Sequence, residues 1–367
     1  MRAGLRIGLV GPLPPPAGGM ANQTQQLAAL LSAEGCKVEL IRTNADYRPT
    51  WIGRIPILRA LSRLAPYKFS LWRTAGRVDL FHVMANSGWS WHLFAVPAIL
   101  IARFRGVPVV VNYRGGEAEV FLRRESKWVL PILRRADALA VPSGFLRDVF
   151  GRFGVQARIV PNIVDLSRFG AKGTYTGNGA PHLVVTRNLE ALYDCATALR
   201  AFAIVRRRFP RARLTIAGRG PEREMLLGLA GQLGVGEATS FPGSLDRDAM
   251  ASLYASADLM LNPSRVDNMP NSVLEALASG VAVVSTNVGG VPYMVNDGRT
   301  ALLVPPGDPQ AMADAALRIL SEPSLASALV AAGREMAQRY TWPEVRTQLA
   351  ALYEEVLRVS AATRSPV

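Results

Sequence analysis

Residues 259–286 read LMLNPSRVDNMPNSVLEALASGVAVVST. This stretch predicts a short apolar strand over 259–261, a polar loop, a helix over 272–279 and a second strand over 281–286. A strand, a helix and a strand in this order build a parallel βαβ unit. Short β-rich runs alternate with longer helical patterns in the same way along most of the chain. The sequence therefore predicts an α/β protein with doubly wound parallel sheets.

The domain organisation follows from length and from one break in the pattern. A chain of 367 residues suits two domains, and a polar, glycine-rich stretch at 170–179 is typical of an interdomain linker. We expect Rossmann-like domains over 1–169 and 180–341, followed by a C-terminal helix over 342–367. Ligands of such folds bind where the carboxyl ends of the strands open, which we expect at a central cleft between the domains.

Composition excludes several classes of protein. Hydrophobic residues make up 49% of the chain, so intrinsic disorder is excluded. The two cysteines, Cys36 and Cys195, lie far apart in sequence, which predicts free thiols in a reducing compartment. The three histidines lack the spacing of a metal site, so we expect no bound metal.

The positive charge is concentrated in the first half of the chain. Residues 1–170 hold 23 Lys and Arg against 10 Asp and Glu, whereas residues 171–367 hold 19 against 18. Residues 48–77 carry seven basic side chains, two tryptophans and no acid. This segment, interrupted by Pro56 and Pro66, is typical of a basic amphipathic surface that binds an anionic membrane. The alternative is a helix that packs its apolar face on its own domain.

Other partners and a location are also indicated. Because no zinc-finger or RNP-type motif accompanies the positive charge, we expect no nucleic-acid partner. The apolar run over 93–102 is too short to span a bilayer. We expect a cytoplasmic protein that is peripheral on the inner face of the plasma membrane, and the sequence says nothing of its oligomeric state.

The pair Asp267 and Glu275, eight residues apart, is the strongest chemical signal. The predicted helix places Asp267 in the loop before its start and Glu275 in its first turn. The backbone N–H groups and the dipole of a helix start favour a diphosphate, and carboxylates accept hydrogen bonds from sugar hydroxyls. The alternative is a helix cap built by Asn271 or Ser272.

Two glycine-rich turns are weaker signals. Gly18 and Gly19 open the predicted first helix, where backbone N–H groups can approach a phosphate or a sugar, or where the chain simply turns. The turn AGRGPE, residues 217–222, lacks a third glycine, and we assign it mainly to structure.

Several segments together resemble the retaining glycosyltransferases of family 4. The run from Asp267 to Glu275, with ALASGVAV after it and TNVGGVP at 286–292, is similar to the E-x7-E region of that family. Further similar segments are VPSGFL (141–146), VPNIVDLSRF (160–169), AGRGPERE (217–224), FPG (241–243) and NDGRTALLVPPGD (296–308). The resemblance implies the GT-B fold, in which the C-terminal helix crosses back to the first domain. It also implies transfer of a sugar from a nucleoside diphosphate sugar, a co-substrate, with no cofactor.

The resemblance implies a role for three charged residues. Glu275 would bind the ribose of the donor, Asp267 would face the transferred sugar, and Arg187 would neutralise the leaving diphosphate. We therefore expect Asp267 and Arg187 to be catalytic. The remaining donor-binding residues would be Asn268, Met269, Pro270, Asn271, Ser272, Gly18 and Gly19.

The chain departs from the family pattern at three places. The family's phosphate-binding lysine falls on Leu192, so we expect Arg265, and less strongly Arg219, to supply the missing charge. The usual His-Gly after the fourth strand is replaced by NYRGGE, residues 112–117. We expect Arg114 and Glu117 to line the acceptor or sugar side, with a purely structural role as the alternative. A glutamate of the family is replaced by Tyr293.

The function expected from the resemblance is retaining sugar transfer. The donor would be a UDP- or GDP-sugar and the acceptor a lipid-linked glycan, a polysaccharide or a glycolipid at the cytoplasmic membrane face. Three alternatives stay open: a nucleotide-sugar epimerase or phosphorylase on the same fold, a catalytically silent membrane-docking scaffold, and a nucleic-acid-binding module.

Overall fold

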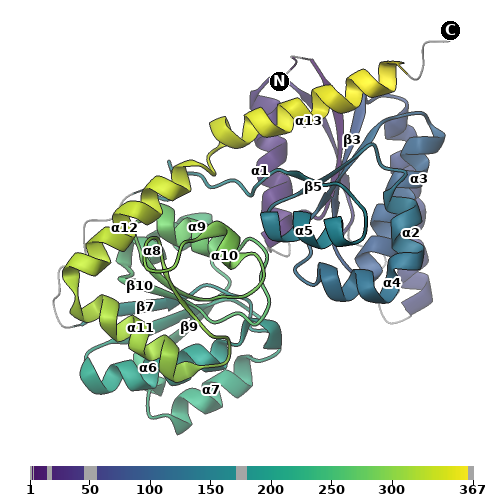
Figure 1. Ribbon diagram of the computed structural model, residues 1–367. Coiled ribbons are helices and arrows are strands. Elements are labelled where there is room, and N and C mark those ends of the chain that lie inside the picture. Colours follow the sequence, from purple (N-terminus) through teal and green to yellow (C-terminus); the bar gives the residue numbers. More distant parts are fainter. Residues whose placement is uncertain (1, 3, 15–18, 45–55, 171–179, 363–367) are drawn as a thin grey trace. The chain divides into compact units, whose positions relative to one another are not determined.

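The computed structural model describes residues 2, 4–14, 19–44, 56–170 and 180–362, without the side chains of 56–62. The chain divides into two compact units, Met1–Pro161 with Pro343–Val367, and Asn162–Trp342. Each unit is a parallel sheet with helices on both faces (Figure 1). The expected linker, 170–179, lies outside the described residues except for Gly170.

The first unit contains a six-stranded sheet in the order β2-β1-β3-β4-β5-β6, and all of its strand pairs are parallel. Its elements are β1 (Arg6–Gly11), α1 (Gly19–Ala33), β2 (Lys37–Arg42), α2 (Pro56–Ala75), β3 (Leu80–Ala85), a π-helical turn (Trp91–Ala95), α3 (Val96–Phe104), β4 (Val109–Tyr113), α4 (Ala118–Leu133), β5 (Ala138–Val141), α5 (Gly144–Arg152), β6 (Arg158–Ile159) and α13 (Trp342–Ala362).

The second unit repeats this design in the order β12-β11-β10-β7-β8-β9, again with parallel pairs. Its elements are β7 (His182–Val185), a 3-10 turn (Ala191–Tyr193), α6 (Cys195–Arg208), β8 (Arg213–Ala217), α7 (Arg223–Gln232), a 3-10 turn (Gly236–Ala238), β9 (Thr239–Gly243), α8 (Arg247–Ser256), β10 (Leu259–Asn262), α9 (Asn271–Ala278), β11 (Ala282–Thr286), α10 (Val291–Met294), β12 (Leu302–Val304), α11 (Pro309–Ser321) and α12 (Pro323–Gln338).

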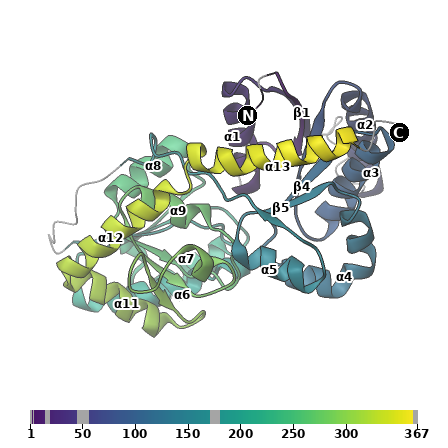
Figure 2. The same cartoon turned by 45° about the horizontal axis from the view of Figure 1, so that its top comes forward.

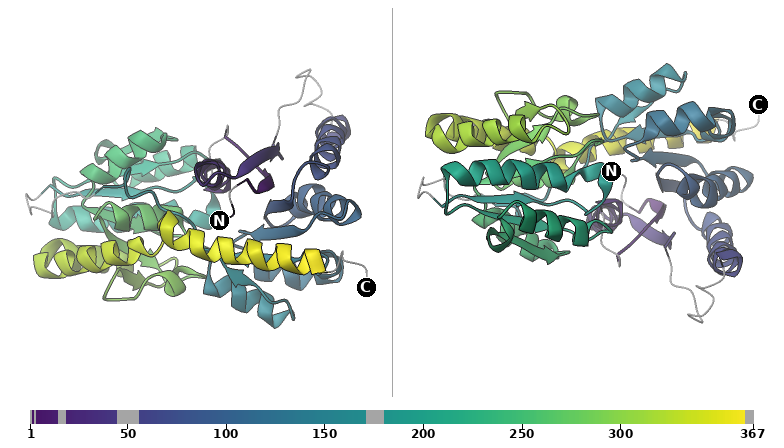
Figure 3. Two further views of the ribbon diagram at one scale, coloured as in Figure 1. Left: turned by 90° about the horizontal axis from the view of Figure 1, so that it is seen from above. Right: turned by 90° about the horizontal axis from the view of Figure 1, so that it is seen from below.

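Alternation along the strands builds the core of the second unit. In β7, Leu183 and Val185 pack against one apolar cluster, whereas Val184 between them packs against the other. Successive side chains of a strand point to opposite faces, so both faces of this sheet are buried under helices (Figure 3). Phe169 packs against Tyr254, with ring centroids 6.0 Å apart, and so belongs with the second unit.

In the first unit, too, both faces of the sheet are buried. Phe81 and Val111 lie in a cluster with residues from α2, α3, α4 and α5. The opposite face of the sheet carries His82, which contacts Tyr353 of α13. Figure 2 shows α13 lying along this unit, as the expectation of a helix that crosses back requires.

Helix α2 corrects one expectation of the sequence. Pro66 lies inside a continuous helix and does not break it, whereas Pro56 occupies its first residue. Proline is tolerated at a helix start because its missing N–H has no partner there. Pro66 is exposed, so its ring faces outward.

Each sheet has one switch point, where the chain leaves neighbouring strands in opposite directions. It lies between β1 and β3 in the first unit and between β7 and β10 in the second. Open parallel sheets bind ligands beyond the strand carboxyl ends at this point. Gly11 at the end of β1 and Gly19 at the start of α1 neighbour the first position, and Arg187 and Asp267, which follow β7 and β10, neighbour the second.

Among the described residues, no single helix is long and apolar enough to cross a membrane. The helix Pro309–Ser321 and the segment Pro323–Ala362, which holds α12 and α13, reach the required length and hydropathy only together, with a bend of 100° at the break between them.

Candidate active site

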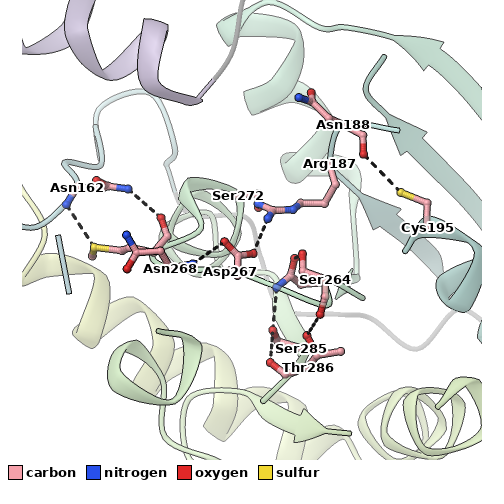
Figure 4. Close-up of polar contacts among 12 residues, drawn as sticks. Asn162, Arg187, Asn188, Cys195, Ser264, Asp267, Asn268, Ser272, Ser285 and Thr286 are labelled. Atoms are coloured by element: carbon pink, nitrogen blue, oxygen red, sulfur yellow. Dashed lines mark hydrogen bonds and ion pairs between the residues drawn. The ribbon is translucent and has the colours of Figure 1, made fainter. Parts of the chain in front are cut away.

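Arg187 and Asp267 meet at the switch point of the second sheet. Arg187 follows the end of β7, and Asp267 lies in the loop after β10, the strand beside it. The Nη2 of Arg187 donates to Oδ2 of Asp267 (Figure 4). Their side chains are only 10% and 9% exposed, so the ion pair is largely shielded from water. Two residues to which the sequence gives separate roles are thus direct partners.

Among the described residues, one nitrogen of the Arg187 guanidinium has no hydrogen-bond partner. Its Nη1 donates to the hydroxyl of Ser272 over 3.2 Å, and its guanidinium lies 4.2 Å from the ring centroid of Tyr193. Its Nε is buried and has no hydrogen-bond partner among the described residues. A buried unpaired donor costs about 1–3 kcal/mol, and an acceptor bound there would recover that cost.

Two glycines allow the Asp267 loop to lie as it does. A Cβ on Gly290 would stand 1.8 Å from the carbonyl oxygen of Asn268, and one on Gly289 would stand 2.0 Å from that of Asp267. The Gly290 N–H donates to the Asp267 carbonyl over 3.1 Å. The glycines of TNVGGVP therefore permit a backbone approach that no other residue allows.

The turn at 217–222 supports Arg187 from the other side. A Cβ on Gly218 would stand 2.0 Å from the Arg187 carbonyl oxygen, and one on Gly220 would stand 2.2 Å from that of Leu189. The Leu189 N–H donates to the Arg219 carbonyl over 3.0 Å. These contacts give both glycines of the turn a structural role.

Helix α9 starts beside the ion pair without a side-chain cap. Its N-cap position is Pro270, which offers no side-chain hydrogen bond. The hydroxyl of Ser272 accepts from Arg187, and Oδ1 of Asn271 accepts from Asn162 over 2.6 Å. The alternative of a cap by Asn271 or Ser272 is therefore wrong, because both side chains serve more distant partners.

Asn162 is a site residue that the sequence did not single out. Its Nδ2 donates to the carbonyl oxygen of Met269 over 2.8 Å, and its N–H lies 3.3 Å from the Met269 sulfur (Figure 4). Asn162 is 6% exposed and holds the loop before α9. The segment VPNIVDLSRF contains it, but local sequence gives no sign that it binds residues more than 100 positions away.

Glu275 lies on α9 in a half-buried position. Burial raises the pKa of its carboxyl from 4.5 to about 7, although Arg247 and the hydroxyl of Tyr254 act in the opposite direction. Tyr254 is fully buried, donates to the Ser272 carbonyl over 3.0 Å and pairs with the Thr186 hydroxyl at 2.7 Å. Tyr254 thus joins the end of β7 to the first turn of α9.

Arg265 does not approach Arg187 through any described contact. Its Nε donates over 3.0 Å to Asp194, which is buried and has a positive φ of 44°. The side chain of Arg265 is 63% exposed. Arg219 is exposed as well.

The residues expected on the acceptor side belong to the first unit. Arg114 follows β4, and its Nε donates to Oδ1 of Asn112 over 3.1 Å, while Nη1 lies 3.4 Å from Oε1 of Gln23. Glu117 is exposed at the start of α4. Gly19 begins α1, and Gly18 lies outside the described residues.

Both cysteines are free, as the sequence predicts, and the structure buries them; burial raises the pKa of Cys195 to about 12. In the described parts of the chain, no three His, Cys, Asp or Glu side chains lie close enough to hold a metal ion. The switch point brings together a cation, a carboxylate and an uncapped helix start, a combination that suits an anionic ligand with hydroxyl groups.

Two parallel-sheet units, one with this site, define the class as the GT-B fold. The chain has a TM-score of 0.76 to an Anabaena protein, HepE, solved with UDP-glucose, at 17% identity and covering 95% of this chain and 99% of that one. A sucrose-phosphate synthase from Thermosynechococcus elongatus also has a TM-score of 0.76, at 20% identity over 97% of this chain and 100% of that one.

Sequence comparison identifies the family. The model for glycosyl transferases group 1 matches residues 178–336, and the model for Glycosyltransferase Family 4 matches residues 17–168. The chain therefore belongs to glycosyltransferase family 4.

Curated relatives agree with this assignment. A phosphatidyl-myo-inositol mannosyltransferase of Mycobacterium leprae is 28% identical over 96% of this chain and 97% of its own length. A glycogen synthase of Mycobacterium tuberculosis is 30% identical over 71% of this chain, which spans 66% of that protein.

Proposed function

We propose that the protein is a retaining glycosyltransferase that moves a sugar from a UDP- or GDP-sugar to a lipid-linked or glycan acceptor at the cytoplasmic membrane face. The convergence of Arg187 and Asp267 beside the start of α9 carries this proposal, because it places a cation and a carboxylate at a strand switch point. Family membership and the UDP-glucose complex of HepE support the choice of donor class.

Arg187 binds the diphosphate and stabilises the charge that develops as it leaves. Its unpartnered Nε and the start of α9 beside it are suited to phosphate oxygens. Asp267 keeps the guanidinium in place before the donor arrives, and it accepts a hydrogen bond from a hydroxyl of the transferred sugar.

The transfer proceeds by front-face substitution. The bond from the anomeric carbon to the diphosphate breaks, and the acceptor oxygen bonds to that carbon from the same face. The proton of the acceptor hydroxyl passes to an oxygen of the leaving diphosphate. This route retains the anomeric configuration and asks for neither a protein base nor a metal ion.

Glu275 accepts hydrogen bonds from the ribose hydroxyls. Because the pKa of its carboxyl is about 7 before the donor binds, part of the population is protonated at neutral pH. Ribose hydroxyls that donate to the carboxylate favour the ionised form, so donor binding releases a fraction of a proton. Arg265 supplies a second phosphate contact once its side chain leaves Asp194.

The acceptor binds the first unit, near Arg114 and Glu117. The name of the mannosyltransferase relative, which acts on phosphatidyl-myo-inositol, supports a lipid-borne acceptor. The basic charge of residues 1–170 suits an anionic inner membrane face.

Helix α2 offers the described part of a membrane-contacting surface. Tyr67 and Leu71 are buried, so one face of the helix packs on its own unit, as the alternative interpretation expects. Phe69 and Trp72, at other positions of α2, are 66% and 43% exposed, and α2 also carries exposed basic side chains. Residues 48–55 lie outside the described residues.

Vesicle co-sedimentation tests the membrane contact. The protein should sediment with vesicles that contain phosphatidylglycerol and not with neutral phosphatidylcholine vesicles. Trp72→Ala should weaken sedimentation several-fold, whereas Tyr293→Ala, which removes an aromatic 53% exposed in the second unit, should not. Equal sedimentation with both vesicle types would contradict an electrostatic membrane contact.

A panel of UDP-, GDP- and ADP-sugars in EDTA, with and without membrane lipid extract, tests the catalytic proposal. Release of nucleoside diphosphate from one donor, stimulated by lipid and abolished by Glu275→Ala, is expected, with retention confirmed by the proton spectrum of the product. Epimerised donor would identify an epimerase, and phosphate-dependent sugar phosphate would identify a phosphorylase. If none of the donors is turned over, the result favours the membrane scaffold. A salt-sensitive mobility shift of duplex DNA would favour nucleic-acid binding.

A further inference from the structure

A chain of polar side chains crosses the layer between the first sheet and helix α13. Nε of Arg114 donates to Oδ1 of Asn112 over 3.1 Å, Nδ2 of Asn112 lies 3.0 Å from Nε2 of His82, and Nδ1 of His82 lies 2.8 Å from the hydroxyl of Tyr353. Asn112 and His82 are 0% exposed and Tyr353 is 1% exposed. This hydrogen-bonded series of side chains joins β4 and β3 to α13, which is distant from them in sequence.

The hydrogen bonds of this chain have a defined direction. Oδ1 of Asn112 accepts from Arg114, so the amide nitrogen of Asn112 faces His82 and donates to it. Nε2 of His82 is then the acceptor, and its proton lies on Nδ1, which donates to the Tyr353 hydroxyl. Burial and the charge of Arg114 lower the pKa of His82 to about 3, so the ring is neutral at physiological pH.

Burial of these polar side chains lowers the stability of the fold relative to apolar ones, which suggests that they serve a purpose other than stability. Each buried polar group loses its hydration, and a hydrogen bond returns only about 0.5–1.5 kcal/mol net. The neighbouring side chains Leu9 and Leu80 are apolar and fully buried, so apolar residues would fill this layer at lower cost. The hydrogen bonds through Asn112, His82 and Tyr353 instead hold Arg114, at one end of the series, in one fixed orientation.

Arg114 lies at the switch point of the first sheet. It follows β4, while its Nη1 approaches Gln23 on α1, the helix that follows β1. Strand β3 lies between β1 and β4, so the side chain reaches across the carboxyl end of β3. Burial lowers the pKa of Arg114 to about 10, which leaves it cationic at neutral pH. A cation thus spans the position where doubly wound sheets bind ligands.

We propose that Asn112, His82 and Tyr353 are positioning residues that hold Arg114 across this switch point, where its guanidinium binds an oxyanion, a phosphate or a carboxylate, of the sugar acceptor. The acceptor part rests on the proposed function, which gives the donor diphosphate to the second unit. A planar guanidinium with a fixed orientation binds an oxyanion through two parallel hydrogen bonds, which a mobile side chain achieves less often.

Arginine side-chain NMR tests the site without turnover. In the full chain labelled with ¹⁵N-arginine, the Arg114 Nε–H signal is assigned by its loss in Arg114→Lys and is followed during titration with inorganic phosphate and, separately, with glucuronate. A saturable shift with phosphate identifies a phosphate-bearing acceptor, and one with glucuronate identifies a carboxylate-bearing one. A signal unmoved by both anions overturns the oxyanion site.

Tyr353→Phe tests the positioning chain, because it removes one hydroxyl and leaves the His82 N–H without its acceptor. We expect at least five-fold weaker anion binding. The matched control is Tyr67→Phe, which removes another buried hydroxyl of the same unit, bonded to the Phe94 carbonyl over 2.7 Å. Unchanged anion affinity in Tyr353→Phe, or an equal loss in both variants, contradicts the positioning role.

Steady-state kinetics then separate this inference from the proposed function. Tyr353→Phe should raise KM for the acceptor at least five-fold, with KM for the donor and kcat within two-fold of the original protein. A fall in kcat with unchanged acceptor KM contradicts the inference while transfer stands. Anion binding at Arg114 without transfer from any donor means that the proposed function fails and that the acceptor assignment fails with it, whereas the oxyanion site remains.

Discussion

Replacement of Asp267 by asparagine should leave Arg187 as a buried cation without its counter-charge. The two side chains are 10% and 9% exposed, so water screens little of the change. Removal of one partner from a buried pair costs about 3–5 kcal/mol. Because Arg187 keeps the Ser272 hydroxyl at 3.2 Å and the Tyr193 ring at 4.2 Å, we expect the lower end, about 3 kcal/mol.

Scanning calorimetry of the donor-free protein measures this effect. In a unit the size of Asn162–Trp342, each kcal/mol corresponds to a Tm change of about 2–4 °C, so Asp267→Asn should lower the Tm of the second unit by about 6–12 °C. The transition of the first unit should not move.

Two control variants make the result specific. Asp248→Asn removes an acid that is 87% exposed and bonded to Arg168, and it should cost less than about 1 kcal/mol. Asp267→Asn combined with Arg187→Met removes both charges and should recover much of the lost stability. If Asp267→Asn shifted Tm no more than Asp248→Asn, the ion pair would not be desolvated and the reasoning would be refuted.

Three further outcomes are expected from individual positions. The pKa of Glu275 is raised from 4.5 to about 7. The contribution of its neutral carboxyl to the free energy of unfolding is therefore fully present below pH 4.5 and is lost as the pH rises through 7. Glu275→Gln should therefore stabilise the second unit at pH 8, by on the order of 2 kcal/mol in urea unfolding, and change little at pH 4. The pKa of His82 is lowered from 6.5 to about 3, so its contribution is complete above pH 6.5 and is lost as the pH falls towards 3. The free energy of unfolding of the first unit should accordingly fall by about 1.4 kcal/mol per pH unit between pH 6 and 4, and a flat profile would contradict a buried neutral ring. Gly218→Ala brings a Cβ to 2.0 Å from the Arg187 carbonyl oxygen and should lower both Tm and nucleotide release, whereas Gly228→Ala, with open space at its Cβ inside α7, should raise Tm slightly and leave release unchanged.

Local pattern was enough to predict the elements around the site. The predicted strand, helix and strand at 259–261, 272–279 and 281–286 correspond to Leu259–Asn262, Asn271–Ala278 and Ala282–Thr286. Hydrophobic periodicity and the turn at Gly280, which has a φ of 73°, are properties of neighbouring residues and can be read from the sequence.

Contacts between distant residues could not be predicted in the same way. Arg187 and Asp267 are 80 residues apart, and only the order of strands in the sheet, with β7 beside β10, brings them together. Arg265 was expected at the phosphates, yet it lies against Asp194, because the charge of a side chain does not reveal its partner.

Polar residues inside apolar runs were the hardest to interpret. His82 lies in the fully buried strand LFHVMA, and its partner Tyr353 is 271 residues away on α13. Asn162 similarly follows a short strand, with nothing nearby to indicate that it holds the loop before α9. Such residues become interpretable only when the hydrogen bonds of a buried layer are followed from one element to the next.

Binding of nucleoside diphosphate to Arg187 variants tests the central claim most directly. Titration calorimetry of UDP and GDP is compared between the original protein, Arg187→Gln and Arg223→Gln, an exposed arginine of α7 bonded to its neighbour Glu224. Loss of a charge-assisted hydrogen bond of about 1.5–3 kcal/mol corresponds to a 10- to 100-fold weaker Kd. We predict this loss in Arg187→Gln alone, in samples whose thermal unfolding shows that they are folded. Equal affinity in all three proteins, or binding of neither nucleotide, would contradict the assignment of the diphosphate to the β7–β10 switch point.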